Sequence, residues 1–175
     1  EKYIKIFCKK NNLNYGILRY FNVAGASTTG KIGQINKGDQ LFKNLSTETL
    51  KKNPIFKIYG AKYNTKDGTC IRDYIHVSDI SEIHYKVLFN INKYKISTIL
   101  NCGYGKGLSV YDVIKEFKKY ANTNLKIIKF PNRSGDMVKI IGDNSKLKKF
   151  IKWSPKFGRL NKIVKSCIIW EKKIK

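Results

Sequence analysis

The chain has 175 residues, of which 42% are hydrophobic and 13% aromatic, so it is long and apolar enough for one domain with a buried core, or for part of a larger one. Its formal net charge of +24 would ordinarily suggest a nucleic-acid partner, but the 32 lysines are spread through every segment beside 24 isoleucines and 16 asparagines, and such a global bias predicts no nucleic-acid site. Because no apolar run approaches the 18 or more residues of a membrane span, we expect no membrane partner either.

The predicted elements alternate between helices and strands, as in a two-layer α/β fold. In chain order they are a helix over 1–11, a strand over 15–22, a loop of small residues over 23–33, a helix over 40–52, a strand over 56–59, a polar turn and strand over 67–77, a helix over 78–91, a strand over 98–102, a helix over 109–120, strands over 125–130 and 138–141, and helices over 144–151 and from 160 onward.

Ser78 is the predicted N-cap of the helix that carries Ile80, Ile83 and Val87 at helical spacing. His84 lies on the same apolar face, so we expect a core histidine and not a catalytic one. His76 alternates with a tyrosine on the preceding strand, and we expect it to be structural as well.

The four cysteines, Cys8, Cys70, Cys102 and Cys167, are far apart and form no CxxC pair. This spacing predicts neither a zinc site nor a dithiol redox site, and we expect reduced thiols. Reduced thiols favour a cytoplasmic location.

Two glycine-containing segments have more than one interpretation. Small residues over 23–33 indicate that the backbone closely approaches either a ligand or another segment of the chain. The turn 103–107 joins a strand to a helix, as in a dinucleotide-binding fingerprint, but its spacing is GxGxG and no acidic residue follows about 20 positions later. A tight structural turn, with Ser109 and Asp112 as a capping box, is therefore the preferred interpretation.

Arginine is scarce in this chain, with four residues against 32 lysines, so each arginine suggests a geometric need for a planar fork. Arg72 either pairs with Asp67 or Asp73 or binds a ligand. Arg133 precedes Asp136 by three residues on one loop, which suits either an anionic ligand with hydroxyl groups or an internal ion pair.

Four segments carry a family resemblance: Leu18-Arg-Tyr-Phe-Asn-Val-Ala-Gly-Ala26, Asp67-Gly-Thr-Cys-Ile-Arg-Asp-Tyr-Ile-His-Val77, Asn101-Cys-Gly-Tyr-Gly-Lys-Gly-Leu-Ser-Val110 and Arg133-Ser-Gly-Asp136. Their order and spacing resemble the UDP-glucose 4-epimerases of the extended short-chain dehydrogenase/reductase superfamily. The resemblance implies an α/β fold: the end of an NAD-binding Rossmann-type parallel sheet, built by 1–26 and parts of 67–110, plus a smaller α/β lobe that binds the substrate.

The resemblance also implies a reaction and site residues. Hydride passes from C4 of a UDP-hexose to tightly bound NAD and returns to the opposite face of the 4-keto intermediate. The implied residues are Tyr20 and Phe21 for the cofactor, Tyr20, Asn22 and Leu41 for the substrate, Tyr59 for uracil, Arg72 and Arg133 for the diphosphate, and Asp136 for the ribose.

Three positions depart from the family pattern. Gln40 and Lys43 stand where the family normally has an Asn or His and a Pro, which puts uracil contacts from this stretch in doubt. Asn132 replaces an arginine that often precedes the position of Arg133.

By the same resemblance, the glycine-rich NAD loop and the catalytic Tyr-x-x-x-Lys pair belong upstream of Glu1. We therefore expect a carboxyl-terminal half, inactive alone, of a cytoplasmic and homodimeric enzyme. The alternatives are another NAD-dependent nucleotide-sugar epimerase, a 4,6-dehydratase, or a non-catalytic module that binds nucleotide sugars.

Overall fold

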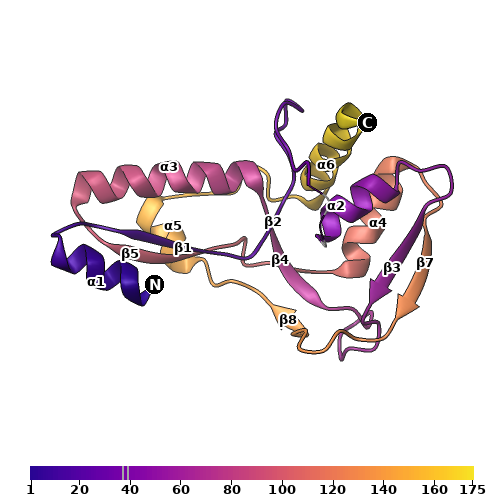
Figure 1. Ribbon diagram of the computed structural model, residues 1–175, viewed down its shortest axis with the longest axis horizontal. Helices are drawn as coiled ribbons and strands as arrows, with labels where there is room; N and C mark the ends of the chain where they lie inside the picture. Colours follow the sequence, from indigo (N-terminus) through magenta and orange to yellow (C-terminus); the bar gives the residue numbers. More distant parts are fainter. Residues whose placement is uncertain (37, 39) are drawn as a thin grey trace.

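The computed structural model describes residues 1–36, 38 and 40–175, and it is an elongated α/β structure (Figure 1). At one end, β1 (Gly16–Tyr20) pairs in parallel with β5 (Thr98–Cys102). The long helix α3 (Val77–Tyr94) packs on this pair, and Figure 1 draws α1 (Lys2–Lys10) on its opposite side. Gly16 permits the close approach of α3, since a Cβ atom there would lie 2.6 Å from Ile91 Cδ1.

At the other end, β3 (Ile55–Tyr59) pairs in parallel with β7 (Lys126–Phe130). Three helices pack against one another beside this pair: α2 (Leu41–Glu48), α4 (Val110–Ala121) and α6 (Leu160–Ile174). The helix α5 (Ser145–Ile151) instead packs on α3 and β5.

Strand β4 (Ile71–His76) joins the two ends of the molecule (Figure 1). Its second half pairs in parallel with β2 (Asn22–Ala24), and its first half pairs with β6 (Gly107–Ser109) and β8 (Lys139–Ile140). Five of its six residues are buried. Because it is covered on both faces, this strand is a rigid element from which side chains can be positioned.

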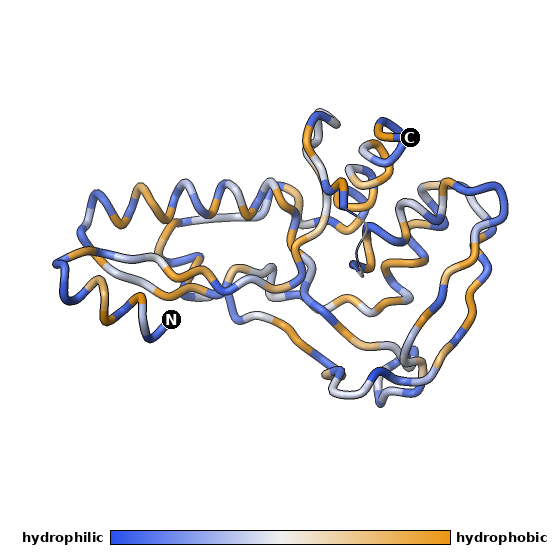
Figure 2. Tube along the Cα trace, viewed as in Figure 1, coloured by the Kyte–Doolittle hydropathy of each residue, from blue (hydrophilic) through white to orange (hydrophobic). Residues whose placement is uncertain are grey.

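The buried residues form two hydrophobic clusters, one at each end. The cluster around α3 contains Ile75, Ile80, Ile83, Val87, Ile91, Leu100, Cys102, Leu147, Ile151 and Trp153. The larger cluster joins α2, α4 and α6 to β3 and includes Phe42, Leu45, Ile58, Val113, Phe117, Ile163 and Ile168. Along α3, apolar and polar residues alternate at helical spacing (Figure 2), so one face of the helix is buried.

Most of the predicted elements are confirmed, and the strand 98–102 has the predicted bounds. The predicted strand 15–22 is wrong as a single element, because the chain leaves β5 and joins β4 at Phe21. The helix predicted over 40–52 ends at Glu48, with Thr49 as its C-cap. The short strand β6 was not predicted from the sequence pattern.

Two predictions about α3 are wrong. Its N-cap is His76 and not Ser78, since His76 Nδ1 accepts a hydrogen bond of 3.0 Å from the Ser78 amide. His84 is exposed and not in the core. The buried stripe is narrow and follows Ile80, Ile83 and Val87, so a residue one position away from it already reaches the surface.

The small residues of 23–33 approach other segments of this chain, which was one of the two interpretations. Gly25 has a φ of +94°, and a Cβ atom there would lie 2.7 Å from the ring of His76. A Cβ atom at Gly33 would lie 2.5 Å from the ring of Trp170. No helix in the described part of the chain is both long and apolar enough to span a bilayer.

Candidate functional site

Arg72 stands near the start of β4 with only 10% of its side chain exposed. Its Nη2 forms an ion pair with Asp136, and its Nη1 donates a hydrogen bond of 3.0 Å to the Ile71 carbonyl. The predicted alternatives, pairs with Asp67 or Asp73, are therefore wrong. The actual partner lies 64 residues away in the sequence, on the loop between β7 and β8.

The same loop brings Arg133 to the end of β3. The guanidinium carbon of Arg133 lies 4.6 Å from the centroid of the Tyr59 ring, which itself packs at 5.2 Å against Phe130. An arginine over an aromatic face is a favourable cation–π arrangement. The internal ion pair of Arg133 and Asp136, which was the alternative to a ligand site, is not formed; Asp136 pairs with Arg72 instead.

Tyr59, Arg72, Arg133 and Asp136 thus come together where the loops following β3 and β7 approach the start of β4, and we call these four residues the arginine cluster. They combine two guanidinium groups, a carboxylate and an exposed aromatic face. Such a set can bind a phosphate through the forked donors, a hydroxyl through the carboxylate and a flat ring through stacking.

The other predicted ligand residues lie outside the arginine cluster. Tyr20 is half exposed at the carboxyl end of β1, where its hydroxyl is hydrogen bonded to His84 Nε2 and burial raises its pKa. Asn22 is exposed and pairs with Tyr74 on β4. Since Tyr74 is two residues after Arg72, Asn22 is displaced from Arg72 by about 7 Å along the strand.

Phe21 and Leu41 have structural contacts in this fold. The half-buried ring of Phe21 packs against the backbone of Gly103 and Gly142, where any Cβ atom would collide with it. Leu41 begins α2 and packs against the larger hydrophobic cluster. The structure therefore does not bring either residue to the arginine cluster.

Much of the segment around Arg72 serves the fold. Asp67 accepts hydrogen bonds from the Thr69 amide and hydroxyl and from the Ser109 hydroxyl, and Thr69 Oγ1 accepts one from the Val110 amide at 3.1 Å. These bonds tie the β3–β4 loop to the start of α4. Burial opposes ionisation of Asp67, but the bonds from Ser109 and Thr69 nevertheless hold its pKa below the usual value.

The glycine turn 103–107 is filled by a carboxylate from the chain itself. Asp73 is fully buried and accepts hydrogen bonds from the amides of Tyr104 and Gly105, both at 2.9 Å, and from the Gly142 amide at 3.3 Å. These amides are the donors that a phosphate would need. The interpretation as a tight structural turn is thus supported, and the capping box of Ser109 and Asp112 is confirmed.

His76 is fully buried at the end of β4, as expected of a structural residue. Its Nε2 lies 3.1 Å from the Ser166 hydroxyl, and its ring stacks on Phe157 at 4.6 Å. Burial lowers the pKa of His76, so the ring is neutral at physiological pH.

A buried ion pair accounts for Lys43, which departs from the family pattern. Its Nζ pairs with Glu171 on α6 and donates a hydrogen bond of 2.9 Å to the Gln34 carbonyl. Both side chains are at most 7% exposed. Gln40 accepts a bond of 2.9 Å from Gln34, and Asn132 is exposed in the β7–β8 loop. The sequence pattern did not identify the Lys43–Glu171 pair, whose members lie 128 residues apart.

Tyr111 and Lys115 have the Tyr-x-x-x-Lys spacing, a match that the sequence interpretation overlooked. They lie on α4, where the Tyr111 ring packs against the larger hydrophobic cluster and Lys129 Nζ lies 6.0 Å from its centroid. These contacts place the pair on the supporting helix layer and not in the arginine cluster.

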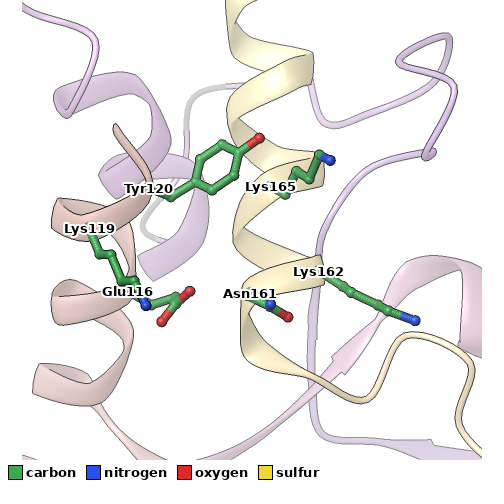
Figure 3. A pocket seen from close by; sticks show the side chains of 6 residues that line it. All are labelled: Glu116, Lys119, Tyr120, Asn161, Lys162 and Lys165. Atoms are coloured by element: carbon green, nitrogen blue, oxygen red, sulfur yellow. The ribbon is translucent and has the colours of Figure 1, made fainter. Parts of the chain in front are cut away.

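A shallow groove runs between α4 and α6 and is lined by Glu116, Lys119, Tyr120, Asn161, Lys162 and Lys165 (Figure 3). Lys162 extends away from α4 and donates to the Lys156 carbonyl at 2.7 Å. The groove is open and its lysines are solvated, so it has no forked, buried donor such as Arg72.

Comparison with known proteins agrees with this geometry. Residues 1–103 match the NAD dependent epimerase/dehydratase family. The chain belongs to that family. Among similar proteins, the UDP-glucose 4-epimerase of Azospirillum brasilense is 37% identical over 159 residues, which are 90% of this chain and 46% of that protein. UDP-arabinose 4-epimerase 1 of Arabidopsis thaliana is 33% identical and matches 98% of this chain and 42% of its own length.

Solved structures are similar over the whole chain. A UDP-glucose 4-epimerase from Stenotrophomonas maltophila, with bound NAD and formylated UDP-arabinopyranose, superimposes with a TM-score of 0.93 at 27% identity, covering 99% of this chain and 52% of that one. The UDP-Glc/GlcNAc 4-epimerase from Campylobacter jejuni gives 0.79 at 39% identity, with 98% and 53% coverage. The predicted resemblance and fold class are confirmed. This family member spans about half the length of the curated relatives it matches.

Proposed function

We propose that the chain is the substrate-binding portion of a UDP-hexose 4-epimerase that acts on UDP-glucose and UDP-galactose. The observation that carries this proposal is the arginine cluster, in which Arg72 and Arg133 converge with Tyr59 and Asp136. In a chain of 32 lysines, two of the four arginines lie within a single cluster. The forked donors match a diphosphate, as a lysine ammonium would not.

Each member of the cluster has a distinct role in this proposal. Arg72 and Arg133 bind the two phosphates. Tyr59 packs against the uracil ring, and Asp136 accepts a hydrogen bond from a ribose hydroxyl. In the structure Asp136 pairs with Nη2 of Arg72, so an incoming phosphate competes with this carboxylate for the guanidinium.

The hexose then extends along β4 toward Asn22 and Tyr20. Tyr20 is the last residue of β1 and Asn22 is the first residue of β2, so both exposed side chains lie at or just past the carboxyl end of the parallel β1–β5 pair. Dinucleotide cofactors meet their substrates at this end of the strands in folds of this kind. These residues fit the nicotinamide end of NAD, with Phe21 holding the junction between β1 and β2 in place. NAD supplies a reversible hydride acceptor for C4 of the sugar.

The phosphates of NAD need other donors than the turn 103–107, because Asp73 already takes the amides of Tyr104 and Gly105. Segments 1–26 and parts of 67–110 contribute to the cofactor sheet in this proposal, and the remainder forms the sugar-nucleotide lobe. Because Tyr111 and Lys115 lie on α4 and outside the arginine cluster, we expect the 175 residues alone to bind a UDP-sugar without epimerising it. The complete enzyme is then an NAD-dependent homodimer.

A UDP-pentose is the second candidate substrate, since plant UDP-arabinose 4-epimerases match nearly the whole chain at 33% identity. Both candidates share the UDP group and differ only in the sugar, which the arginine cluster does not contact in this proposal.

Titration calorimetry of the 175-residue chain tests the proposal with UDP, UDP-glucose, UDP-galactose, UDP-arabinose and duplex DNA. We expect saturable binding of UDP and its sugars that persists at moderate salt, because Arg72 is largely desolvated. Binding to DNA should fall steeply with salt, as for any polycation. Absence of UDP binding, or a salt dependence as steep as that for DNA, would falsify the proposal.

A further inference from the structure

The hydroxyl of Tyr63 is buried and has no hydrogen-bond partner among the residues that the structure describes. Tyr63 belongs to the loop between β3 and β4, and its backbone is well held. Its amide donates to the Gly68 carbonyl at 2.9 Å, and its carbonyl accepts from the Thr65 amide at 2.8 Å. The loop thus places the phenol ring firmly, although the ring's polar end is not satisfied. A buried polar group in this state is unusual and unfavourable.

Tyr63 lies beside the arginine cluster. Its ring packs over Gly60, which directly follows Tyr59, and a Cβ atom at Gly60 would lie 3.0 Å from the Tyr63 hydroxyl oxygen. Gly60 has a φ of +83°, so this residue both permits the turn after β3 and leaves room for the phenol. The hydroxyl is therefore fixed close to the aromatic wall of the cluster.

The charged groups of the cluster act on this hydroxyl. Burial raises the pKa of Tyr63, and the carboxylate of Asp136 raises it further, while Arg72 and Arg133 act in the opposite direction. The hydroxyl is consequently protonated at neutral pH and available as a donor. Among these charged groups, Asp136 is the one that can accept a hydrogen bond from it.

We propose that Tyr63 is a positioning residue, whose hydroxyl donates a hydrogen bond to Asp136 when the phosphate of a nucleoside diphosphate takes the place of Asp136 at Arg72. This inference rests on the proposed function. Such an exchange gives the displaced carboxylate, whose side chain is 26% exposed, a donor from the protein in addition to the ribose hydroxyl.

The loop that carries Asp136 has room for this movement. Gly135 has a φ of +76°, and no atom lies within 4 Å of a Cβ atom built there. Residues 131–135 are exposed, and the side chain of Asp136 is 26% exposed. A carboxylate has about four acceptor positions, so Asp136 can accept from Tyr63 and from a ribose hydroxyl together.

Tyr63→Phe is the decisive variant, measured by titration calorimetry with UDP and by thermal unfolding without ligand. Since the hydroxyl has no partner among the described residues, its removal should leave the midpoint of unfolding without ligand unchanged or raise it. The affinity for UDP should nevertheless fall roughly tenfold to 150-fold, as for one lost hydrogen bond to a charged group. Tyr120→Phe, which removes an exposed hydroxyl from α4, is the matched control and should change neither quantity.

A double-mutant cycle with Asp136→Ala, which removes the acceptor, tests the exchange itself. If Tyr63 acts through the carboxylate, Tyr63→Phe should cost little further UDP affinity in the Asp136→Ala background. Additive losses would overturn the role through Asp136. A lower unfolding midpoint for Tyr63→Phe would show that the hydroxyl supports the free fold, which also overturns the inference.

The two proposals fail in different ways. If the unmodified chain does not bind UDP, the proposed function fails and this inference fails with it. If the unmodified chain binds UDP and Tyr63→Phe binds it equally well, the arginine cluster keeps its function and only the role of Tyr63 is refuted.

Discussion

Arg72→Lys keeps the positive charge of the arginine cluster and removes its forked geometry. In the structure, the guanidinium uses Nη2 for Asp136 and Nη1 for the Ile71 carbonyl, 3.0 Å away. A lysine carries its three donors on one nitrogen, so it does not present the two separated donors that Nη1 and Nη2 provide to these two acceptors. Because the side chain is only 10% exposed, water does not readily replace the missing donor.

The expected magnitudes follow from that count of hydrogen bonds. One lost bond from a charged donor should lower the free energy of unfolding by about 1.5 kcal/mol. For the ligand, losing the two-point grip on a phosphate should cost about 1.5–3 kcal/mol, which corresponds to a roughly tenfold to 150-fold weaker affinity for UDP.

Titration calorimetry with UDP measures the second effect, and denaturant unfolding measures the first. Arg159→Lys is the matched control, because Arg159 is exposed before α6 and makes no capping hydrogen bond there. We expect this control to bind UDP as the unmodified chain does. If Arg72→Lys loses no more affinity than Arg159→Lys, the forked geometry is not needed and the assignment of Arg72 to the diphosphate is refuted.

Three further predictions concern the fold that supports the cluster. Lys43→Met leaves the buried carboxylate of Glu171 without its cation and should lower the free energy of unfolding by about 3–5 kcal/mol. Denaturant unfolding measures this loss, and a loss below about 1 kcal/mol would contradict the prediction. Gly103→Ala places a Cβ atom 2.5 Å from Asp73 Oδ2, and this overpacking should lower the free energy of unfolding by about 1–3 kcal/mol. The midpoint of thermal unfolding should fall accordingly. An unchanged midpoint would show that the turn accommodates the added methyl group. The lowered pKa of Asp67 means that its contribution to stability is complete above the unfolded-state pKa of about 4 and is lost as the pH falls through the lower folded-state value. Unfolding measured between pH 6 and pH 3 should therefore depend less on pH in Asp67→Asn, and equal slopes would oppose this role.

Most of the helices and strands could be predicted because the residues that specify each of them lie close together in the sequence. Strand β5 and the capping box of Ser109 and Asp112 depend on residues within a few positions of one another, so periodicity and capping rules suffice. The break at Phe21 depends on which strand each segment pairs with, β5 before it and β4 after it. Such partners lie far apart in sequence, and strand propensity does not specify them.

For the candidate site too, the sequence indicated single residues but not their distant contact partners. The scarcity of arginine indicated Arg72 and Arg133 as functional candidates, but not their actual partners. Asp136 reaches Arg72 across 64 residues, and Tyr59 reaches Arg133 only because β3 and β7 pair in register at Tyr59 and Phe130. His84 was misplaced because an apolar pattern defines a face only approximately, and packing against β1 and β5 decides how wide the buried stripe becomes.

The fixed length of strand β4 limits which insertions and deletions this protein can tolerate. The strand holds Arg72 near one end and His76 at the other, and it is paired along both halves. Deleting or inserting one residue between them would shift Arg72 relative to Asn22 by about 3.3 Å and turn every later side chain to the opposite face. The loops on either side can change length without altering that separation. Under the proposed function, the strand therefore sets the length of ligand that fits between Arg72 and Asn22, and changes in ligand preference should arise in the loops around it.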